Sequence, residues 1–388
     1  MPIRIKKKSI NNTLNSASRY NKLKYDIDHE EWNSNWIEIE VDSSRPWGEG
    51  LNFIDLFSGA GGISCGFVSA GFSKIFSVEI DKDASSTIRH NFPNSTHFEL
   101  PIEHLTDTVI MDEIAGMQVD VICGGPPCQG FSVAGLRNPH DPRNMLFAEY
   151  LRVVKIVMPK FIMIENVPGI LTMGNGAVCH EILRQLNNIG YEFTSVRILE
   201  AAEYGVPQLR TRAIFIGNRL NMKNPYPKPK FTKENYRTIE SAIDDLKNLP
   251  FDPKINHHGT THRPPMIEQI RKVSPGGSLY DTFRDAWKRQ YKGVPCMTIK
   301  ENHGGVHIHY ELDRVLTARE MARLQTFPDE FIFSGTFKRA YWQIGNAVPC
   351  LLANEIAQAL GYALKNTDKM KRTPMPIVRQ LSLLEDLS

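Results

Sequence analysis

The sequence predicts an α/β protein with one large domain and one smaller domain. Residues 51–80 read as a buried strand, a glycine-rich turn, a helix and a second buried strand, which is how a nucleotide-binding βαβ unit begins. Two further apolar runs, at residues 119–123 and 161–164, are typical of buried strands in a parallel sheet. A chain of 388 residues is long enough for such a sheet and a second, smaller domain.

The composition is ordinary for a soluble globular protein, with 41% hydrophobic and 23% charged residues. No run approaches the roughly 18 apolar residues of a membrane span. The amino terminus is basic and lacks the apolar core of a secretory signal, so we expect a cytoplasmic protein with no membrane partner. The six cysteines form no C-x-x-C pair, which favours reduced thiols over a zinc site or a disulfide framework.

Positive charge gathers in two parts of the chain, although the net charge is only +3. Residues 1–24 hold seven Lys and Arg and no acid, and residues 218–310 hold 16 Lys and Arg, nine Asp and Glu and half of the histidines. Such segments favour a polyanionic partner, but a solvated surface explains the charge equally well. We interpret residues 1–48 as a basic extension with a small packed part around its tryptophans.

The first strand, residues 51–57, leads into the turn Ser58-Gly59-Ala60-Gly61-Gly62, and a helix runs from there to residue 70. The second strand, residues 75–80, brings Glu79 to a position where it can accept hydrogen bonds from ribose hydroxyls. Ser64 stands where a G-x-G-x-x-G pattern needs its last glycine, which argues against a nicotinamide or flavin dinucleotide. An adenosine-containing ligand without a pyrophosphate fits this turn better.

A helix is expected at residues 82–91, followed by the strand at 119–123 and the loop Gly124-Gly-Pro-Pro-Cys128-Gln-Gly-Phe-Ser132. The strand delivers Cys128 to its carboxyl end, where ligands collect in an open α/β sheet. The two prolines stiffen the loop, which makes the Cys128 thiol a candidate nucleophile. Taken alone, a Pro-Cys pair is more often a small apolar residue packed in a turn.

A helix at residues 145–157 precedes the strand at 161–164, which delivers Glu165 to the same edge of the sheet. A thiol and a carboxyl at neighbouring strand ends point to a catalytic crevice, although a plain salt bridge also explains Glu165. A helix at residues 176–189 and strands at 192–199 and 213–217 follow.

Arg210 and Arg212 lie two positions apart on an extended segment, so their side chains should point the same way. Together they could clamp an anion or a carboxyl group, or they could form a surface pair.

The composition changes at residue 218. The proline- and lysine-rich residues 224–230 predict a linker, and the following short elements to residue 312 predict a second, basic domain. His303, His307 and His309 are weak metal-ligand candidates, because they have no cysteine partners and no helical H-x-x-x-H spacing. No metal site is therefore expected.

A capping box at residues 317–320 opens a helix that extends to residue 325. Residues 343–349 are expected to start a last helix, with Pro349 in its first turn and an end near residue 364. Residues 366–388 read as a loose tail.

Six motifs, in this order, make the chain similar to the DNA (cytosine-5) methyltransferase family of the bacterial restriction-modification type. They are Asp55-Leu-Phe-Ser-Gly-Ala-Gly-Gly62, Gly125-Pro-Pro-Cys-Gln-Gly-Phe-Ser132, Glu165-Asn-Val167, Gln208-Leu-Arg-Thr-Arg212, Arg319-Glu-Met-Ala-Arg-Leu-Gln-Thr-Phe-Pro328 and Gly345-Asn-Ala-Val348. The resemblance implies a Rossmann-like, S-adenosylmethionine-dependent methyltransferase domain with a smaller target-recognition domain. The domains implied are 1–48 (basic extension), 49–217 (catalytic and cofactor-binding), 218–312 (target recognition), 313–365 (return to the catalytic domain) and 366–388 (tail).

The resemblance also implies the reaction, in which a methyl group passes from S-adenosyl-L-methionine to carbon 5 of a cytosine flipped out of double-stranded DNA. Cys128 would bond to carbon 6, Glu165 would hydrogen-bond the ring, and Arg212, with Arg210, would orient that site. The cofactor residues implied are Asp55, Phe57, Gly59, Gly61, Gly62, Glu79, Ile80, Pro126, Asn346 and Val348. The phosphate-contact candidates are Arg271, Lys272, Arg284, Lys288 and Arg289. We expect a monomer that works beside a restriction endonuclease without a stable complex.

One position departs from the family pattern. The family usually carries an aspartate that contacts the adenine amine, and Leu100-Pro101-Ile102 stand there instead. Glu99 or Glu103 could substitute, or packing on Ile80 and backbone groups could hold the ring.

An RNA (tRNA) cytosine-5 methyltransferase of similar build is the main alternative, and Gly130 after Pro-Pro-Cys-Gln argues against it. A DNA-binding relative without activity would lack the Cys or the Glu.

Overall fold

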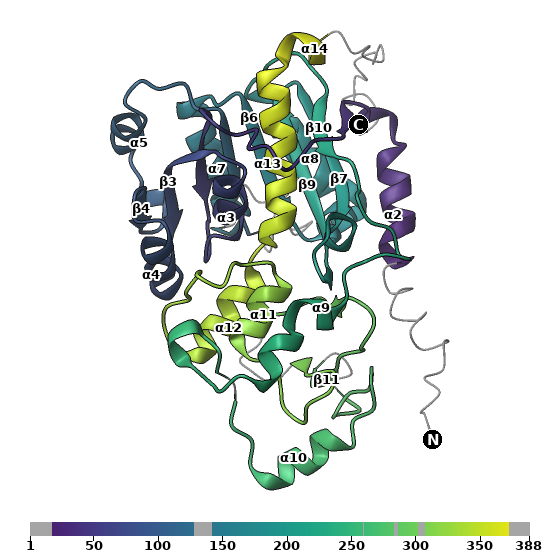
Figure 1. Ribbon diagram of the computed structural model, residues 1–388. Helices are drawn as coiled ribbons and strands as arrows, with labels where there is room; N and C mark the ends of the chain where they lie inside the picture. Colours follow the sequence, from purple (N-terminus) through teal and green to yellow (C-terminus); the bar gives the residue numbers. More distant parts are fainter. Residues whose placement is uncertain (1–17, 128–141, 259, 283–285, 302–306, 372–388) are drawn as a thin grey trace.

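The computed structural model describes residues 18–127, 142–258, 260–282, 286–301 and 307–371. Its centre is a seven-stranded sheet in the order β4-β3-β2-β5-β6-β9-β7 (Figure 1). Neighbours from β4 to β6 are parallel, whereas β9 runs antiparallel to β6 and β7. These strands are β2 (Asn52–Leu56), β3 (Ser73–Glu79), β4 (Thr96–Glu99), β5 (Val121–Gly124), β6 (Phe161–Asn166), β7 (Phe193–Glu200) and β9 (Thr211–Asn218).

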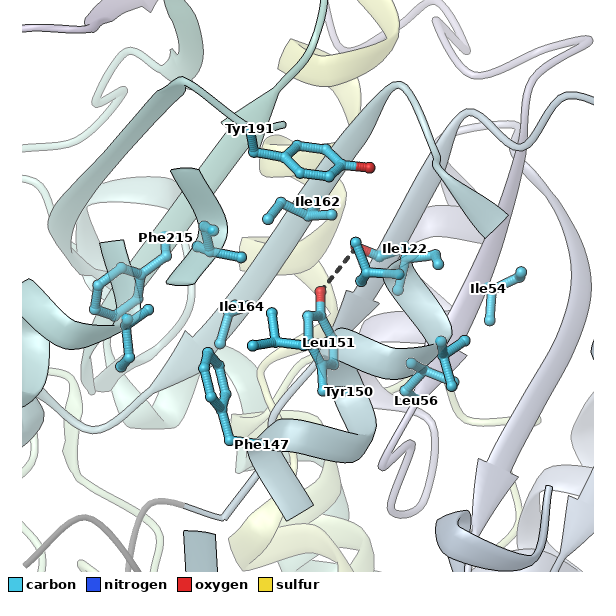
Figure 2. Packing of buried hydrophobic residues seen from close by; sticks show 14 of the residues in the cluster. Ile54, Leu56, Ile122, Phe147, Tyr150, Leu151, Ile162, Ile164, Tyr191 and Phe215 are labelled. Atoms are coloured by element: carbon cyan, nitrogen blue, oxygen red, sulfur yellow. Dashed lines mark hydrogen bonds between the residues drawn. The ribbon is translucent and has the colours of Figure 1, made fainter. Parts of the chain in front are cut away.

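Helices α5 (Asp107–Ile114), α7 (Pro142–Val157) and α8 (Ala177–Asn188) contribute to the core on one face of the sheet. Figure 2 shows Tyr150 of α7 among Leu151, Ile162 and Ile164, with its hydroxyl donating to the Ile122 carbonyl at 3.4 Å. The buried hydroxyl thus keeps a hydrogen bond inside an otherwise apolar layer.

Helices α3 (Gly62–Ser69) and α13 (Cys350–Lys365) pack together on the opposite face, although they lie near opposite ends of the chain. Glycines of α3 allow this close contact. A Cβ on Gly62 would lie 2.2 Å from the Val348 carbonyl oxygen, and one on Gly66 would lie 2.5 Å from the Ala353 Cβ. The stretch Phe337–Lys365 is long and apolar enough to cross a membrane, but 83% of its most apolar window is buried inside the fold.

A second unit lies below the sheet in Figure 1 and has its own core. The predicted capping box is confirmed here, because Thr317 Oγ1 accepts from the Glu320 amide at 3.1 Å and the Glu320 carboxylate accepts from the Thr317 amide at 2.7 Å. Its elements are α9 (Ile239–Ile243), α10 (Pro264–Arg271), α11 (Ala318–Leu324), α12 (Phe337–Asn346), β11 (Lys288–Arg289), β12 (Cys296–Met297) and β13 (His307–Ile308). Strand β12 pairs with β8 (Gln208–Leu209) of the large unit.

The linker expected at residues 224–230 is wrong for its first half. Residues Asn224–Pro227 form the buried strand β10, which pairs in parallel with β1 (Trp36–Ile39). The side-chain amide of Asn224 donates to the carbonyls of Phe193 and Ile216 in the central sheet. These hydrogen bonds stabilise a strand here, although prolines are unfavourable within strands.

The start of the described chain covers the edge strand β7. Helix α2 (Ser18–Asp28) lies beside β7, and Asn33 exchanges hydrogen bonds with the backbone N–H and C=O of Val196 at 2.9 and 2.7 Å. Arg197 of β7 pairs with Asp28 and Glu38 at 2.7 and 2.8 Å. The side chain of Asn33 therefore satisfies backbone groups that an open edge would leave exposed.

The start expected for the last helix is also wrong. Gln343 and Asn346 belong to the end of α12, which begins at Phe337 after the capping residue Thr336, and α13 starts only at Cys350.

The remaining elements are α4 (Lys82–Asn91), α14 (Thr367–Lys371) and the short 3₁₀ helices Glu31–Asn33, Ile102–His104, Pro168–Leu171, Met173–Gly176, Ala201–Tyr204, Asp244–Asn248 and Pro253–Ile255. The domain boundaries stay a prediction.

Candidate active site

A cavity of about 390 Å³ lies at the carboxyl ends of strands β2 to β6, the edge at which ligands gather in such sheets. The second unit closes it with residues from the end of α12. The lining residues are Phe57, Ser58, Gly59, Ala60, Gly62, Ile63, Val78, Glu79, Ile80, Leu100, Pro101, Ile102, Glu103, Gly125, Pro127, Leu146, Glu165, Trp342, Gln343, Asn346, Ala347 and Val348.

The glycine-rich turn after β2 forms one wall through an unusual backbone. Phe57 has φ 56°, a left-handed conformation that costs a non-glycine residue about 1–3 kcal/mol. Gly59 has φ 52°, which a glycine adopts freely. Its amide donates to Glu79 Oε2 at 2.8 Å, so the turn is tied to the end of β3.

Glu79 is a largely buried acceptor at the cavity wall. Its other oxygen, Oε1, accepts from the amides of Ile80 and Asp81 at 3.0 and 2.9 Å. Burial raises the pKa of Glu79, and these amide bonds oppose the rise. Oε1 thus accepts two hydrogen bonds, whereas Oε2 accepts one and retains a lone pair for a further donor. The neighbouring Ile80 is 64% exposed and lines the cavity.

The wall after β4 contains only one of the two acids considered as an aspartate substitute. Glu103 lines the cavity beside Leu100, Pro101 and Ile102, whereas Glu99 forms an ion pair with Arg89 at 2.5 Å. Glu103 and the apolar surface of these residues are therefore the groups available near Ile80.

Trp342 and Gln343, which the sequence did not single out as site residues, line the cavity from α12. Gln343 Oε1 accepts from the Thr87 hydroxyl of α4 at 2.6 Å, and Arg339 forms ion pairs with Asp81 and Asp83. These bonds hold the second unit against the first. The only sequence signal was their position directly before the Gly345-Asn-Ala-Val348 motif.

Three of the expected cofactor residues do not line the cavity. Asp55 is fully buried beneath the turn, where the Ser64 hydroxyl donates to it at 2.6 Å, and burial raises the pKa of Asp55 to about 6. A Cβ on Gly61 would meet the side chains of Ile88 and Phe92, so this glycine faces α4. Pro126 is buried below the loop. The other seven expected residues all line it.

The carboxylate of Glu165 reaches the cavity from the end of β6. Arg212 on the neighbouring strand β9 pairs with it, with 2.6 Å between Arg212 Nε and Glu165 Oε1. A Cβ on Gly125 would stand 3.2 Å from Glu165 Oε2, so a glycine leaves room for the carboxylate. Both side chains are mostly buried, at 14% and 11% exposure, which strengthens their attraction.

The expected nucleophile, Cys128, lies outside the described residues. The chain leading to it is anchored, because the Asn166 amide group donates to the Pro126 carbonyl at 3.2 Å. Pro127, the residue directly before Cys128, lines the same cavity as Glu165. Asn166 is thus a further site residue, although the sequence marked it only as part of the Glu165-Asn-Val167 motif.

Arg210 points to a different place from Arg212. Its guanidinium donates to the carbonyls of Ile299 at 2.8 Å and Gly345 at 3.0 Å, and the side chain is fully buried. Burial lowers the pKa of Arg210 well below the usual arginine value, and the charge of Arg212 adds to this effect. The expectation that the side chains of Arg210 and Arg212 point the same way is wrong. Arg210 lies between β8 and β9, so the two residues do not belong to one regular strand.

Arg289, one of the expected phosphate contacts, is buried instead. It donates to the backbone carbonyls of Val273, His309, Leu312 and Ile270 and cannot reach DNA. Arg271 is paired with Glu268 and Asp313, Arg284 lies outside the described residues, and Lys272 is exposed.

His307 and His309 of the second unit have structural partners. Burial lowers the pKa of His307 to about 3, and its Nε2 accepts from the Lys300 amide at 3.3 Å. His309 Nδ1 accepts from the Glu311 and Leu312 amides, each at 3.0 Å. His303 lies outside the described residues. In the part of the chain that the structure describes, no three His, Cys, Asp or Glu side chains gather so as to hold a metal ion.

The family model of C-5 cytosine-specific DNA methylases matches residues 51–362. The chain belongs to this family. It is 40% identical to the type II methyltransferase M1.HphI of Haemophilus parahaemolyticus over 80% of this chain and 86% of that protein. It is 33% identical to the type II methyltransferase M.DdeI of Desulfomicrobium norvegicum, over 85% and 93% of the two chains.

A solved structure of a putative DNA modification methyltransferase from an Escherichia coli prophage has 29% identity and a TM-score of 0.66, covering 81% of this chain and 99% of that one. The Spodoptera frugiperda DNMT2 structure, at 21% identity and a TM-score of 0.58, shares the fold. The expected family, enzyme class and Rossmann-like fold are confirmed, and the RNA alternative is not favoured.

The methylase uses S-adenosyl-L-methionine, and the cavity fits this cofactor. Glu79 Oε2 has a lone pair that could accept from a ribose hydroxyl, residues of the Phe57–Gly62 turn line the cavity, and Ile80 could offer an apolar face to an adenine ring. Asn346 and Val348 close the cavity from the second unit.

Proposed function

We propose that this DNA methyltransferase modifies carbon 5 of a cytosine flipped out of a specific double-stranded DNA sequence, through a covalent bond between Cys128 and carbon 6. The observation that carries the proposal is Glu165, which lines the cavity together with Pro127 and forms an ion pair with Arg212. A carboxylate held at one strand end, in the same cavity as the residue that directly precedes a cysteine, supports a nucleophile working with a hydrogen-bonding group.

Carbon 5 of cytosine is a poor nucleophile, so the ring must first be activated. The Cys128 thiolate forms a bond to carbon 6, and the electron pair of the 5,6 double bond becomes available at carbon 5. Glu165 hydrogen-bonds ring nitrogen 3 and the exocyclic amine, where charge changes during the attack, and Arg212 holds its carboxylate in place. S-adenosyl-L-methionine supplies the electrophilic methyl group. A base, water in the simplest case, then removes the carbon 5 proton, and Cys128 leaves as the double bond re-forms.

A stacked cytosine cannot reach a cavity at the end of a sheet. The base must therefore leave the duplex, at a cost of a few kcal/mol. Phosphate contacts by basic residues of the second unit offset this cost, and exposed residues such as Lys272 are available for them.

The biological role that fits these features is protection of DNA from a partner restriction endonuclease. The type II relatives support this role, and the enzyme would act as a cytoplasmic monomer without a stable complex with the endonuclease. Plasmid DNA from cells that express the chain should resist one member of a panel of restriction enzymes, whereas cleavage by every member would contradict the role.

The covalent step is tested with DNA in which 5-fluorocytosine replaces cytosine. Fluorine cannot leave as a proton, so the wild-type enzyme should remain bound to this DNA in a denaturing gel when the cofactor is present. Cys128→Ser should form no such complex and transfer no methyl group, while it still binds duplex DNA, because a hydroxyl at neutral pH is far less nucleophilic than a thiolate. An active Cys128→Ser enzyme would overturn the proposal.

A further inference from the structure

Residues 296–301, which we call the bridging segment, join the second unit to the large one. The Cys296 amide donates to the Pro207 carbonyl at 3.0 Å, and the Thr298 hydroxyl donates to the Leu209 carbonyl at 2.6 Å. The Ile299 amide donates to Gln208 Oε1 at 2.8 Å. The segment is therefore fixed along β8, just before the Arg212 that holds Glu165.

Arg210 connects this segment to the cofactor cavity. Its Nη1 donates to the Ile299 carbonyl in the bridging segment, and its Nη2 donates to the Gly345 carbonyl at the end of α12. The next residues along the chain, Asn346, Ala347 and Val348, form the cavity wall. A planar guanidinium can hold two carbonyls in fixed directions, which an ammonium on a flexible stem does poorly.

Gly345 brings the same two segments into direct contact. A Cβ at this position would stand 2.3 Å from the Lys300 carbonyl carbon and 2.3 Å from the Glu301 amide nitrogen. Only a glycine lets the backbones approach this closely, so a displacement of the bridging segment must move the start of the cavity wall.

We infer that Arg210 is a positioning residue that couples DNA binding on the second unit to cofactor binding in the cavity. The inference rests on the proposed role of residues 218–312 in DNA recognition. DNA that holds the bridging segment in this position also holds residues 345–348, so DNA tightens cofactor binding, and by linkage the cofactor tightens DNA binding by the same factor. Arg210 is buried and contacts these two segments, whereas Arg212 forms the ion pair with Glu165.

The experiment measures the dissociation constant of S-adenosyl-L-homocysteine by calorimetry, with and without plasmid DNA that the wild-type enzyme methylates. The ratio of the two constants is the coupling factor, which for coupled sites is typically about 5 to 150. In Arg210→Lys we expect this factor to fall below about 2. Gly345→Ala should lower it in the same way, because the added Cβ separates the two backbones.

Two matched variants separate coupling from a general loss of stability. Arg319 is also a buried arginine, and it donates to the carbonyls of Ile255, Pro328 and Phe331 without contacting the cavity wall. Arg319→Lys should therefore lower the thermal midpoint but keep the wild-type coupling factor. Gly169→Ala, where an added Cβ meets no atom within 4 Å, controls for the glycine substitution.

The inference is overturned if the wild-type factor is one, if Arg210→Lys keeps the wild-type factor, or if Arg319→Lys loses it equally. The binding measurement does not depend on whether Cys128 is trapped on 5-fluorocytosine. The covalent mechanism and the coupling through Arg210 can therefore be contradicted independently of each other.

Discussion

Arg212 Nε lies 2.6 Å from Glu165 Oε1, across the antiparallel strands β9 and β6. The register pairs Glu165 with Ile214, so Arg212 is its diagonal neighbour on the same face of the sheet. The strand register thereby places Arg212 beside Glu165 Oε1. Glu165 Oε2 lies in the space that Gly125 leaves open.

We expect Glu165→Gln to lower kcat by about 10² to 10⁴, the usual contribution of a positioned acid or base, with the cofactor dissociation constant unchanged. Arg212→Ala should lower kcat by less. Because Arg212 acts through Glu165, the double variant should be little slower than Glu165→Gln alone. Steady-state methylation rates of the four enzymes provide the cycle, and strictly additive losses would contradict an action of Arg212 through this carboxylate.

Glu79→Ala should weaken S-adenosyl-L-methionine binding by about 1–3 kcal/mol, the range for a lost charged hydrogen bond. The loss has two sources, since the same carboxylate also accepts from the Gly59 amide. Glu79→Gln retains an acceptor for that amide and should lose less. Calorimetric titration of both variants measures the difference, and unchanged affinity in Glu79→Ala would place the ribose elsewhere.

Asp55 makes stability depend on pH. Burial raises the pKa of Asp55 from 3.8 in the unfolded chain to about 6, so its stabilising contribution is fully present below pH 3.8 and is lost as the pH rises through 6. A rise of about two pKa units corresponds to roughly 3 kcal/mol. Burial lowers the pKa of Lys74 to about 8, and the negative charge of Asp55 opposes this fall. Ionised Asp55 therefore stabilises the charged form of Lys74, which partly offsets the cost of burying the Asp55 charge.

The comparison with Asp55→Asn isolates this effect. Urea unfolding of both proteins between pH 4 and pH 7 should show the wild type losing stability relative to Asp55→Asn across this range. A constant difference between the two proteins would mean that Asp55 is already ionised at pH 4.

Residues 231–312 should carry the DNA sequence specificity. We place the junction after Lys230, because β10 pairs with β1 and packs on the large unit. When these residues are grafted into a related methyltransferase of different specificity, bisulfite sequencing of DNA from the producing cells should show this enzyme's sites methylated. If an active chimera still methylates its host's original sites, recognition lies in the large unit or in the basic extension.

Much of the site could be predicted because strand ends and glycine turns are local patterns. The acid Glu79 ends a short apolar run, and Glu165 follows one, so each could be placed at the sheet's carboxyl edge from sequence alone. The direction of Arg210 could not be predicted, because it depends on carbonyls at Ile299 and Gly345, which are distant in the sequence. The burial of Arg289 is likewise decided by four carbonyls from other segments.

The errors in the fold have the same origin. The prolines around Tyr226 indicated a linker, but the partner strand β1 lies almost two hundred residues earlier and no local pattern announces the pairing. Asp55 belongs to a motif of which several other residues line the cavity, yet its position in β2 turns its side chain toward Ser64 of α3. Trp342 lines the cavity from α12, which is tied to α4 by Arg339 and Gln343, two contacts between segments distant in the sequence.

The cavity joins residues 57–63 near the start of the chain to residues 342–348 near its end, and α13 covers α3 only after both. During synthesis, a ribosome-bound chain can therefore complete every strand of the central sheet and still lack one wall of the cavity. Any product that stops before α13 leaves the apolar surface of α3 exposed and becomes a substrate for cellular proteases rather than a partly active enzyme. Methylation in the cell therefore requires chains that extend through α13.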